Sequence, residues 1–246
     1  MASSARTVVQ AEVRLFAREP GYVFWIIGFP AVLVVVLGLV PVLREPIDGL
    51  GVSFLTIYVP VAVILAMLMA SLLAMPVVLA TYREQRILRR FATTPVRPRT
   101  VLFAQYLIYG TAAIVGGAVP ILLGFLAYQV ALPQNGVGYL ATALLMLASC
   151  LALGGLVGGI ARTAKIATAW GSILLFPLMF TAGVWLPVQT MPGLLGDLVA
   201  LTPLGAGALA LNATAAGGWP GLQEVTVLTA WTAIFGFAAV RFFRWE

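Results

Sequence analysis

Residues 52–80 read VSFLTIYVPVAVILAMLMASLLAMPVVLA, an apolar run of about 29 residues without a charged side chain. A helix needs about 20 apolar residues to cross the hydrocarbon core of a bilayer. Because lipid offers no partners to backbone amides, a run of this length predicts a membrane-spanning helix. Its excess length predicts either a strong tilt or an extension beyond the membrane.

Further apolar runs lie on both sides of this segment. The chain is 62% hydrophobic and 9% charged, with a mean hydropathy of +1.06, values typical of polytopic membrane proteins. We predict an all-α membrane protein in which residues 1–246 form a single transmembrane domain. Its six spans are expected at about residues 22–43, 52–80, 101–130, 139–160, 166–187 and 223–240.

The basic residues lie almost entirely on one side of the predicted membrane. Of the 14 lysines and arginines, only Arg44 lies on the side opposite to the rest. Under the positive-inside rule, this distribution places both termini in the cytoplasm. The sequence pI of about 10.0 therefore indicates topology and not nucleic-acid binding.

Residues 188–222, between the last two spans, are too apolar for an ordinary hydrated loop. A seventh span there would place Arg241 and Arg244 outside and weaken the charge bias. Proline, glycine and asparagine also divide the segment into pieces too short to span a membrane. We therefore expect short re-entrant helices on the outer side, with the turn residues Gly183, Pro187, Pro192 and Pro203.

An amphipathic interfacial helix is predicted before the first span, within residues 1–21. Polar residues, three of them arginines, recur at four-residue spacing beside an apolar face: Arg6, Gln10, Arg14 and Arg18 next to Val9, Val13 and Phe16. Anionic lipid head groups would balance these charges, which favours a helix lying along the inner leaflet. Glu12 interrupts the pattern, and a frayed end with the same charge bias is the alternative.

Residues 82–100 read YREQRILRRFATTPVRPRT and follow the long second span directly. Leu88 and Phe91 place apolar side chains within a cationic stretch, and Pro95 and Pro98 end the helix and stiffen the return. This combination favours a segment that docks on a protein partner. An anchor in anionic membrane lipid, which would need only the arginines, is the alternative.

The residue composition excludes several kinds of chemistry. The chain has no histidine and one cysteine, Cys150, and no ionisable residue lies in the middle of a predicted span. Zinc sites and histidine relays are therefore excluded, and no candidate for an intramembrane proton carrier exists. The same composition counts against a membrane-embedded enzyme.

Residues 84–96, EQRILRRFATTPV, resemble the cytoplasmic loop of type-2 ATP-binding-cassette (ABC) export permeases. Three later stretches are similar to the family's landmarks between the fifth and sixth spans: Gly183-Val-Trp-Leu-Pro187, Met191-Pro192 and Leu201-Thr-Pro-Leu204. Arg86 and Thr202 depart from the glycine and asparagine that are common at these positions. With six spans and an amphipathic N-terminal helix, the resemblance covers essentially the whole chain.

The resemblance implies that ATP hydrolysis takes place on another chain. No G-x-x-x-x-G-K-[ST] phosphate loop occurs in the sequence, so we expect no cofactor here and ATP with magnesium on a separate nucleotide-binding ATPase subunit. The loop after the second span would be the coupling element. The residues that the resemblance implies as contacts with the ATPase subunit are Glu84, Arg89, Arg90, Phe91, Thr94 and Pro95, with Arg14 and Arg18 as secondary contacts.

A dimer with a second permease copy or a paralogue is also implied, with a pathway along spans two and five. The candidate lining residues are Met67, Met69, Met75, Phe176, Met179 and Phe180, for which ordinary packing is the alternative. In span four, Gly154-Gly155 and Gly158-Gly159 form two G-x-x-x-G patterns, which fit either a dimer contact or packing within the chain. Pro60, Pro76 and Pro177 predict bends in spans two and five.

We therefore expect a non-catalytic permease subunit of an ABC exporter in the cytoplasmic membrane of a bacterium. Its cargo would be an amphipathic compound, such as a drug, a natural product or a lipid-linked molecule, moved outward as in multidrug efflux. A secondary carrier or a channel without an ATPase partner is the alternative.

Overall fold

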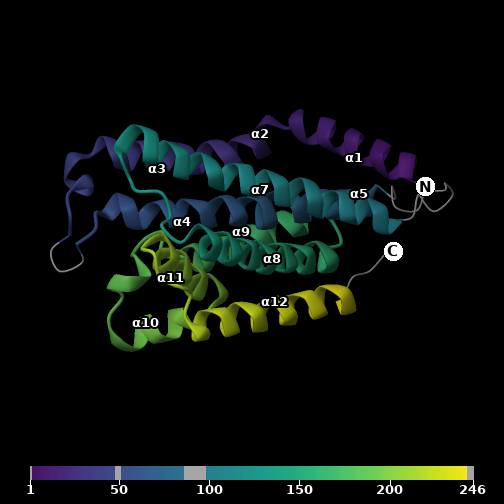
Figure 1. Ribbon diagram of the computed structural model, residues 1–246. Helices are drawn as coiled ribbons and strands as arrows, with labels where there is room; N and C mark the ends of the chain where they lie inside the picture. Colours follow the sequence, from purple (N-terminus) through teal and green to yellow (C-terminus); the bar gives the residue numbers. More distant parts are fainter. Residues whose placement is uncertain (1, 48–50, 86–97, 243–246) are drawn as a thin grey trace.

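The computed structural model of the chain describes residues 2–47, 51–85 and 98–242, and every regular element within these ranges is helical. Six helices or helix runs there are long and apolar enough to be candidate membrane spans, the number that the sequence predicts. They lie roughly side by side in one elongated bundle (Figure 1). The first turn of α1 (Ala2–Ala17) and the last turn of α12 (Leu222–Phe242) lie at the same end of this bundle.

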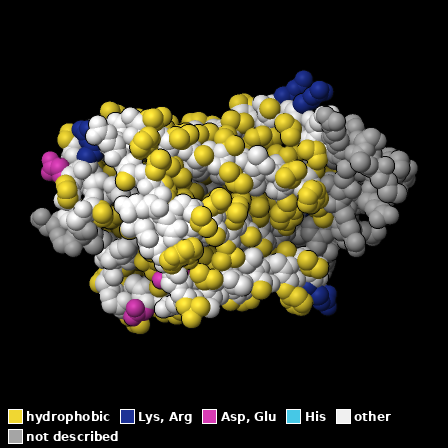
Figure 2. Space-filling model, viewed as in Figure 1, with side chains coloured by type: hydrophobic (Ala, Val, Ile, Leu, Met, Phe, Trp, Pro, Cys, Tyr) yellow, Lys and Arg dark blue, Asp and Glu magenta, His cyan; other side chains and the backbone are white. Residues whose placement is uncertain are grey.

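The two ends of the bundle differ in charge. The end with α1 carries the basic residues Arg14, Arg18, Arg162, Lys165 and Arg241, and we call it the basic end. The opposite, acidic end carries Glu45, Asp197 and Glu224 together with Arg44. Figure 2 shows hydrophobic side chains along the visible face, with the charged side chains of the described residues near its two ends.

The second span is the central helix of the bundle. It runs without interruption through α4 (Phe54–Leu68), the π-helical turn η3 (Met69–Ala74) and α5 (Met75–Glu84), 31 residues in all, most of them buried. Ser53 caps its start by accepting a hydrogen bond from the Thr56 N–H at 3.2 Å. At about 1.5 Å per residue it is about 46 Å long, more than a hydrocarbon core needs.

Four further spans surround it, and the sixth lies outside them. The first span joins α2 (Pro20–Val23), the π-helical turn η1 (Phe24–Gly28) and α3 (Phe29–Leu39). The others are α7 (Pro98–Tyr128), α8 (Gly136–Ile160), α9 (Ala164–Thr181) and α12 (Leu222–Phe242). The α4 half of the second span packs against α3 and α7, the α5 half packs against α8 and α9, and α12 packs along α8.

Both π-helical turns precede a proline and are covered by a glycine of a neighbouring helix. Because proline has no N–H, Pro30 and Pro76 leave the carbonyl oxygens of Ile26 and Leu72 without the usual helical donor. A methyl group on Gly116 of α7 would collide with the Ile26 oxygen, and one on Gly171 of α9 with the Leu72 oxygen. Neighbouring backbones therefore come close where these spans widen.

The glycines of span four pack within the chain. A methyl group on Gly154 would collide with the Ser71 carbonyl oxygen, and one on Gly155 with the Tyr106 hydroxyl group. One on Gly158 would come within 3.2 Å of the Pro76 Cα atom. Of the two interpretations of the G-x-x-x-G patterns, packing within the chain is therefore the one that these contacts support.

The fifth span ends at Thr181, six residues before the predicted boundary at residue 187. Gly183 takes a positive φ of 84°, which suits glycine, and the chain turns there. The Gly183 N–H donates to the Phe180 oxygen and the Val184 N–H to the Met179 oxygen, both at 3.0 Å. This pair of bonds is a Schellman motif, which ends the helix despite the apolar sequence that follows.

Two short helices follow, α10 (Gly193–Ala200) and α11 (Pro203–Ala215), with a bend of 94° between them. The bend rules out one straight seventh span in this segment. α11 is largely buried against α4, α8 and α12. The two predicted short helices are therefore present, and their re-entrant position in a membrane stays a prediction.

The N-terminal segment is helical over α1 (Ala2–Ala17) and packs against α7. The Phe16 ring contacts the Tyr109 ring edge to face, with 5.6 Å between their centroids. A helix is therefore present before the first span, where one is predicted. Its position along the inner leaflet stays a prediction.

Candidate functional site

The expected coupling segment follows α5 at the basic end. Of its predicted residues, Arg89, Arg90, Phe91, Thr94 and Pro95 lie outside the described residues. Glu84 is described, and it is the last residue of α5. The structure therefore shows how this segment is attached to the bundle, through the last turn of the second span.

Two adjacent residues of that last turn hold the ends of two other helices. The Arg83 guanidinium donates through Nη1 to the carbonyl oxygens of Gly158 at 3.1 Å and Ala161 at 2.5 Å, at the end of α8. The Glu84 carboxylate accepts a hydrogen bond from the Ala164 N–H at 3.0 Å, in the first turn of α9. We call Arg83 and Glu84 the α5 clamp.

The signs of the two charges suit the helix ends that they contact. The carbonyl oxygens at the end of a helix carry partial negative charge, and the free N–H groups at its start carry partial positive charge. A cation at the end of α8 and an anion at the start of α9 are both stabilising. The α5 clamp therefore joins the second span to the fourth and fifth spans at the basic end.

Sequence reasoning assigned Glu84 to a partner subunit and did not anticipate its contact within the chain. The contact joins residues 80 positions apart, so no local pattern indicates it. The two secondary contacts, Arg14 on α1 and Arg18 just after it, are exposed at the same end of the bundle. Their role toward a partner stays a prediction.

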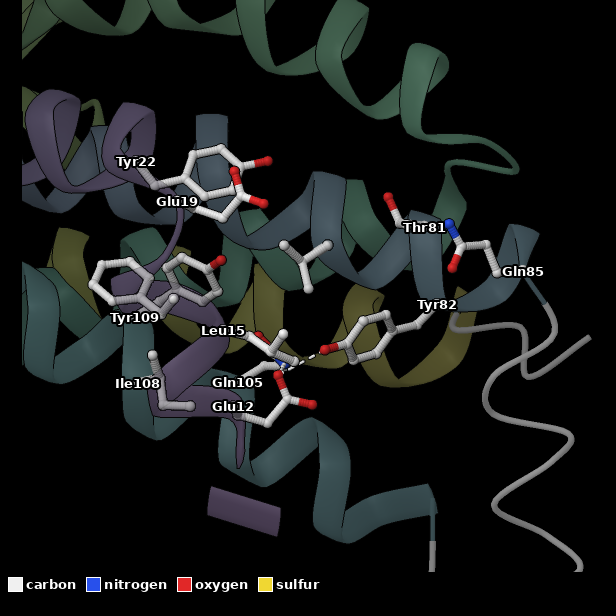
Figure 3. A pocket seen from close by; sticks show the side chains of 12 residues that line it. Glu12, Leu15, Glu19, Tyr22, Thr81, Tyr82, Gln85, Gln105, Ile108 and Tyr109 are labelled. Atoms are coloured by element: carbon white, nitrogen blue, oxygen red, sulfur yellow. Dashed lines mark hydrogen bonds between the residues drawn. The ribbon is translucent and has the colours of Figure 1, made fainter. Parts of the chain in front are cut away.

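The residue that interrupts the cationic pattern of α1 has a defined position. Glu12 is only 8% exposed, and its Oε2 accepts hydrogen bonds from the Tyr82 hydroxyl group at 2.6 Å and Gln105 Nε2 at 2.7 Å (Figure 3). These contacts connect α1 to α5 and α7. The only sign of this site in the sequence is that a glutamate interrupts the cationic pattern.

A cavity of about 410 Å³ opens beside Glu12. It lies between α1, α2, α5 and α7 at the basic end, next to the last turn of the second span. Its polar lining includes Glu12, Glu19, Tyr22, Tyr82, Gln85 and Gln105.

The candidate pathway residues do not form one group in the single chain. Met67, Met69 and Met75 are at most 2% exposed in the core, and Met179 is also buried. Phe180 is half-buried, whereas Phe176 is 64% exposed on the outside of α9. Packing accounts for the four buried methionines within this chain, and pathway lining stays a prediction for all six residues.

The predicted turn residues lie at the ends of helices near the acidic end. Gly183 ends α9, Pro187 precedes a short 3-10 helix, Pro192 precedes α10 and Pro203 begins α11. From the second span, the Tyr58 hydroxyl group donates to the Val184 carbonyl oxygen. The central helix therefore contacts other parts of the bundle near both of its ends.

Comparison with known protein families agrees with this architecture. The family model described as ABC-2 type transporter matches residues 4–213, which is most of the chain. No curated protein gives a significant match. The chain therefore belongs to the ABC-2 type transporter family and is the membrane permease component of an ABC transporter, without catalytic activity of its own.

Proposed function

We propose that this permease exports an amphipathic compound with energy from ATP that a separate nucleotide-binding subunit hydrolyses. That subunit would hold the ATP and the magnesium ion. The observation that carries the proposal is the α5 clamp: only Gln85 separates the arginine-rich segment 86–97 from the two residues that hold the ends of α8 and α9. A displacement of a segment attached in this way can be transmitted to the second, fourth and fifth spans together.

The second span supplies a continuous mechanical connection. When two nucleotide-binding subunits close around ATP, they would displace the segment that includes Arg89, Arg90 and Phe91. The α5 clamp would move α8 and α9 together with α5. Because the helix is continuous and buried as far as Tyr58, the displacement would also reach the turn at Val184.

The charge distribution supports a cytoplasmic position for the basic end. Both termini would then be cytoplasmic, in the cytoplasmic membrane of a bacterium. The exposed Arg14 and Arg18, on α1 and just after it, would face anionic lipid head groups or the same ATPase subunit. The short helices α10 and α11 would enter the membrane from the outer side.

A second permease, either another copy or a paralogue, would complete the pathway. The α9 helix supports this arrangement because Trp170, Ile173 and Phe176 are 49%, 64% and 64% exposed on it at three-residue spacing. Three-residue spacing places these side chains along one face of the helix. We place the partner permease on this face and the cargo, a drug, natural product or lipid-linked molecule, along the shared interface.

Co-purification tests the partner. An affinity-tagged chain is purified from its host in maltoside micelles, and we expect an ATPase with a phosphate loop among the associated proteins. The Arg89→Glu and Arg90→Glu double variant should insert normally but lose this ATPase and any stimulation of ATP hydrolysis by amphipathic compounds. Arg44→Glu, a charge reversal at the acidic end, is the matched control and should behave as wild type.

If the double variant still retains the ATPase and responds to compounds, the docking assignment is wrong. Movement of an amphipathic compound across the membrane of vesicles that contain the purified chain alone, without ATP, would instead support a secondary carrier or a channel.

A further inference from the structure

Glu12 is a nine-tenths-buried carboxylate without a counter-charge among the described residues. Both of its hydrogen bonds go to Oε2 and come from neutral donors, the Tyr82 hydroxyl group and Gln105 Nε2. Its Oε1 accepts no hydrogen bond in the described part of the chain, and Figure 3 shows it turned away from both donors. A buried carboxylate of this kind is costly unless a cation pairs with it.

The cavity beside Glu12 has the lining of a site for an organic cation. Glu19 supplies a second carboxylate, and the rings of Tyr22, Tyr82 and Tyr109 lie around the same space (Figure 3). Aromatic faces and carboxylates together are the groups that bind ammonium ions. The volume of about 410 Å³ lies within the usual range for small-molecule sites.

The same lining argues against other ligands. Two carboxylates would repel a phosphate or another anion, so a free phosphate or an anionic head group is a poor fit. The aromatic rings favour an organic ammonium group over a hydrated metal ion. Within the described residues, no group of three acidic or metal-binding side chains comes together.

The surroundings of the cavity favour a ligand that also carries an apolar part. Phe16 and Ile108 line both this cavity and a second hollow of about 360 Å³ between α1 and α7. The other lining residues of that hollow are almost all apolar, among them Val13, Leu107 and Val115. An acidic site beside apolar surface suits an amphiphile that arrives through the membrane.

We propose that this cavity binds the protonated amine of a membrane-borne amphiphile, with the Glu12 carboxylate as its main contact and Glu19 as the second. The amine can belong to a cationic solute or to an amine-bearing lipid. That the cavity binds an amine depends on the cavity alone. That this amine belongs to the transported cargo rests on the proposed export function.

Binding to the purified chain tests the site directly. In neutral maltoside micelles at pH 7, radiolabelled dodecylamine should bind saturably, and dodecanol, with the same tail and no charge, should not compete. Glu12→Gln keeps the shape and the acceptor oxygen but removes the charge, and we expect it to weaken binding about tenfold or more. Glu45→Gln, the same substitution at an exposed position of the acidic end, should leave binding unchanged.

Glu19→Gln covers the case in which Glu12→Gln does not fold, since Glu19 is exposed and its side chain accepts no hydrogen bond among the described residues. It should weaken dodecylamine binding several-fold without changing the unfolding temperature. Wild-type affinity in both folded variants, or equal competition by dodecanol, would overturn the proposal.

Competition by lysophosphatidylethanolamine would assign the site to an amine-bearing lipid. Competition only by phosphate-free amines would assign it to a cationic solute. No ATPase is present in this assay, so a negative result overturns the amine site and leaves the export function to the co-purification experiment.

Discussion

The middle of the second span and its basic end are built from different interactions. In the middle, Gly154 of α8 and Gly171 of α9 lie against the carbonyl oxygens of Ser71 and Leu72, and the contacts are between backbones. At the basic end, the contacts are hydrogen bonds from the charged side chains of Arg83 and Glu84. The difference suggests that the middle fixes the fold, while the end transmits movement and can be altered without unfolding the chain.

The largest expected effect is therefore on stability, from a change in the middle. Gly154→Val would force α8 away from the Ser71 carbonyl group, because a backbone atom cannot rotate aside as a side chain can. We expect a loss of about 3 kcal/mol or more in the free energy of unfolding. Thermal unfolding of the purified variant in micelles measures it.

Gly236→Val in α12 is the control, since a methyl group there would meet no atom within 4 Å. Similar unfolding temperatures for the two variants would show that close backbone packing in the middle does not set stability.

The second effect is on coupling, from a change at the basic end. Arg83→Gln removes the charge at the end of α8, and we expect stability to fall by only about 1–2 kcal/mol. Stimulation of the partner ATPase by transported compounds should fall much more, because α8 would no longer move with α5. Arg162→Gln, in the same α8–α9 turn and exposed, is the control. If Arg83→Gln instead lowers the stability strongly while the folded protein still stimulates the ATPase normally, the roles assigned to the two regions are reversed.

The same contrast explains what could be predicted from the sequence. The six spans were predictable because each apolar run is long enough to require a helix, whatever its neighbours. The early end of α9 was not, since one glycine with positive φ outweighs the apolar residues after it. The hydrogen-bond partners of Glu84 and Glu12 could not be predicted either, because these bonds join residues 70 to 93 positions apart. In the sequence, a glutamate in a basic segment also resembles a solvated one.

Glu84→Gln should have a smaller effect than Arg83→Gln. The amide oxygen of glutamine can still accept the hydrogen bond from the Ala164 N–H, and only the charge at the start of α9 is lost. We expect a change in stability of about 0.5 kcal/mol and a partial loss of coupling, both reduced further by added salt. Measurements of ATP hydrolysis at low and high ionic strength would separate this charge effect from loss of the hydrogen bond.

The smallest effect on the ATPase is expected from a change near the acidic end, where a neutral hydroxyl group makes the contact. Tyr58→Phe removes the hydrogen bond to the Val184 carbonyl oxygen but keeps the ring that stacks on Phe54, with 5.1 Å between the two centroids. We expect a loss of about 1 kcal/mol or less. ATPase binding should be unchanged, because the basic end is intact, while protease cleavage within residues 184–192 should become faster. If Tyr58→Phe instead releases the ATPase, the two ends of the second span are coupled more tightly than their separate contacts imply.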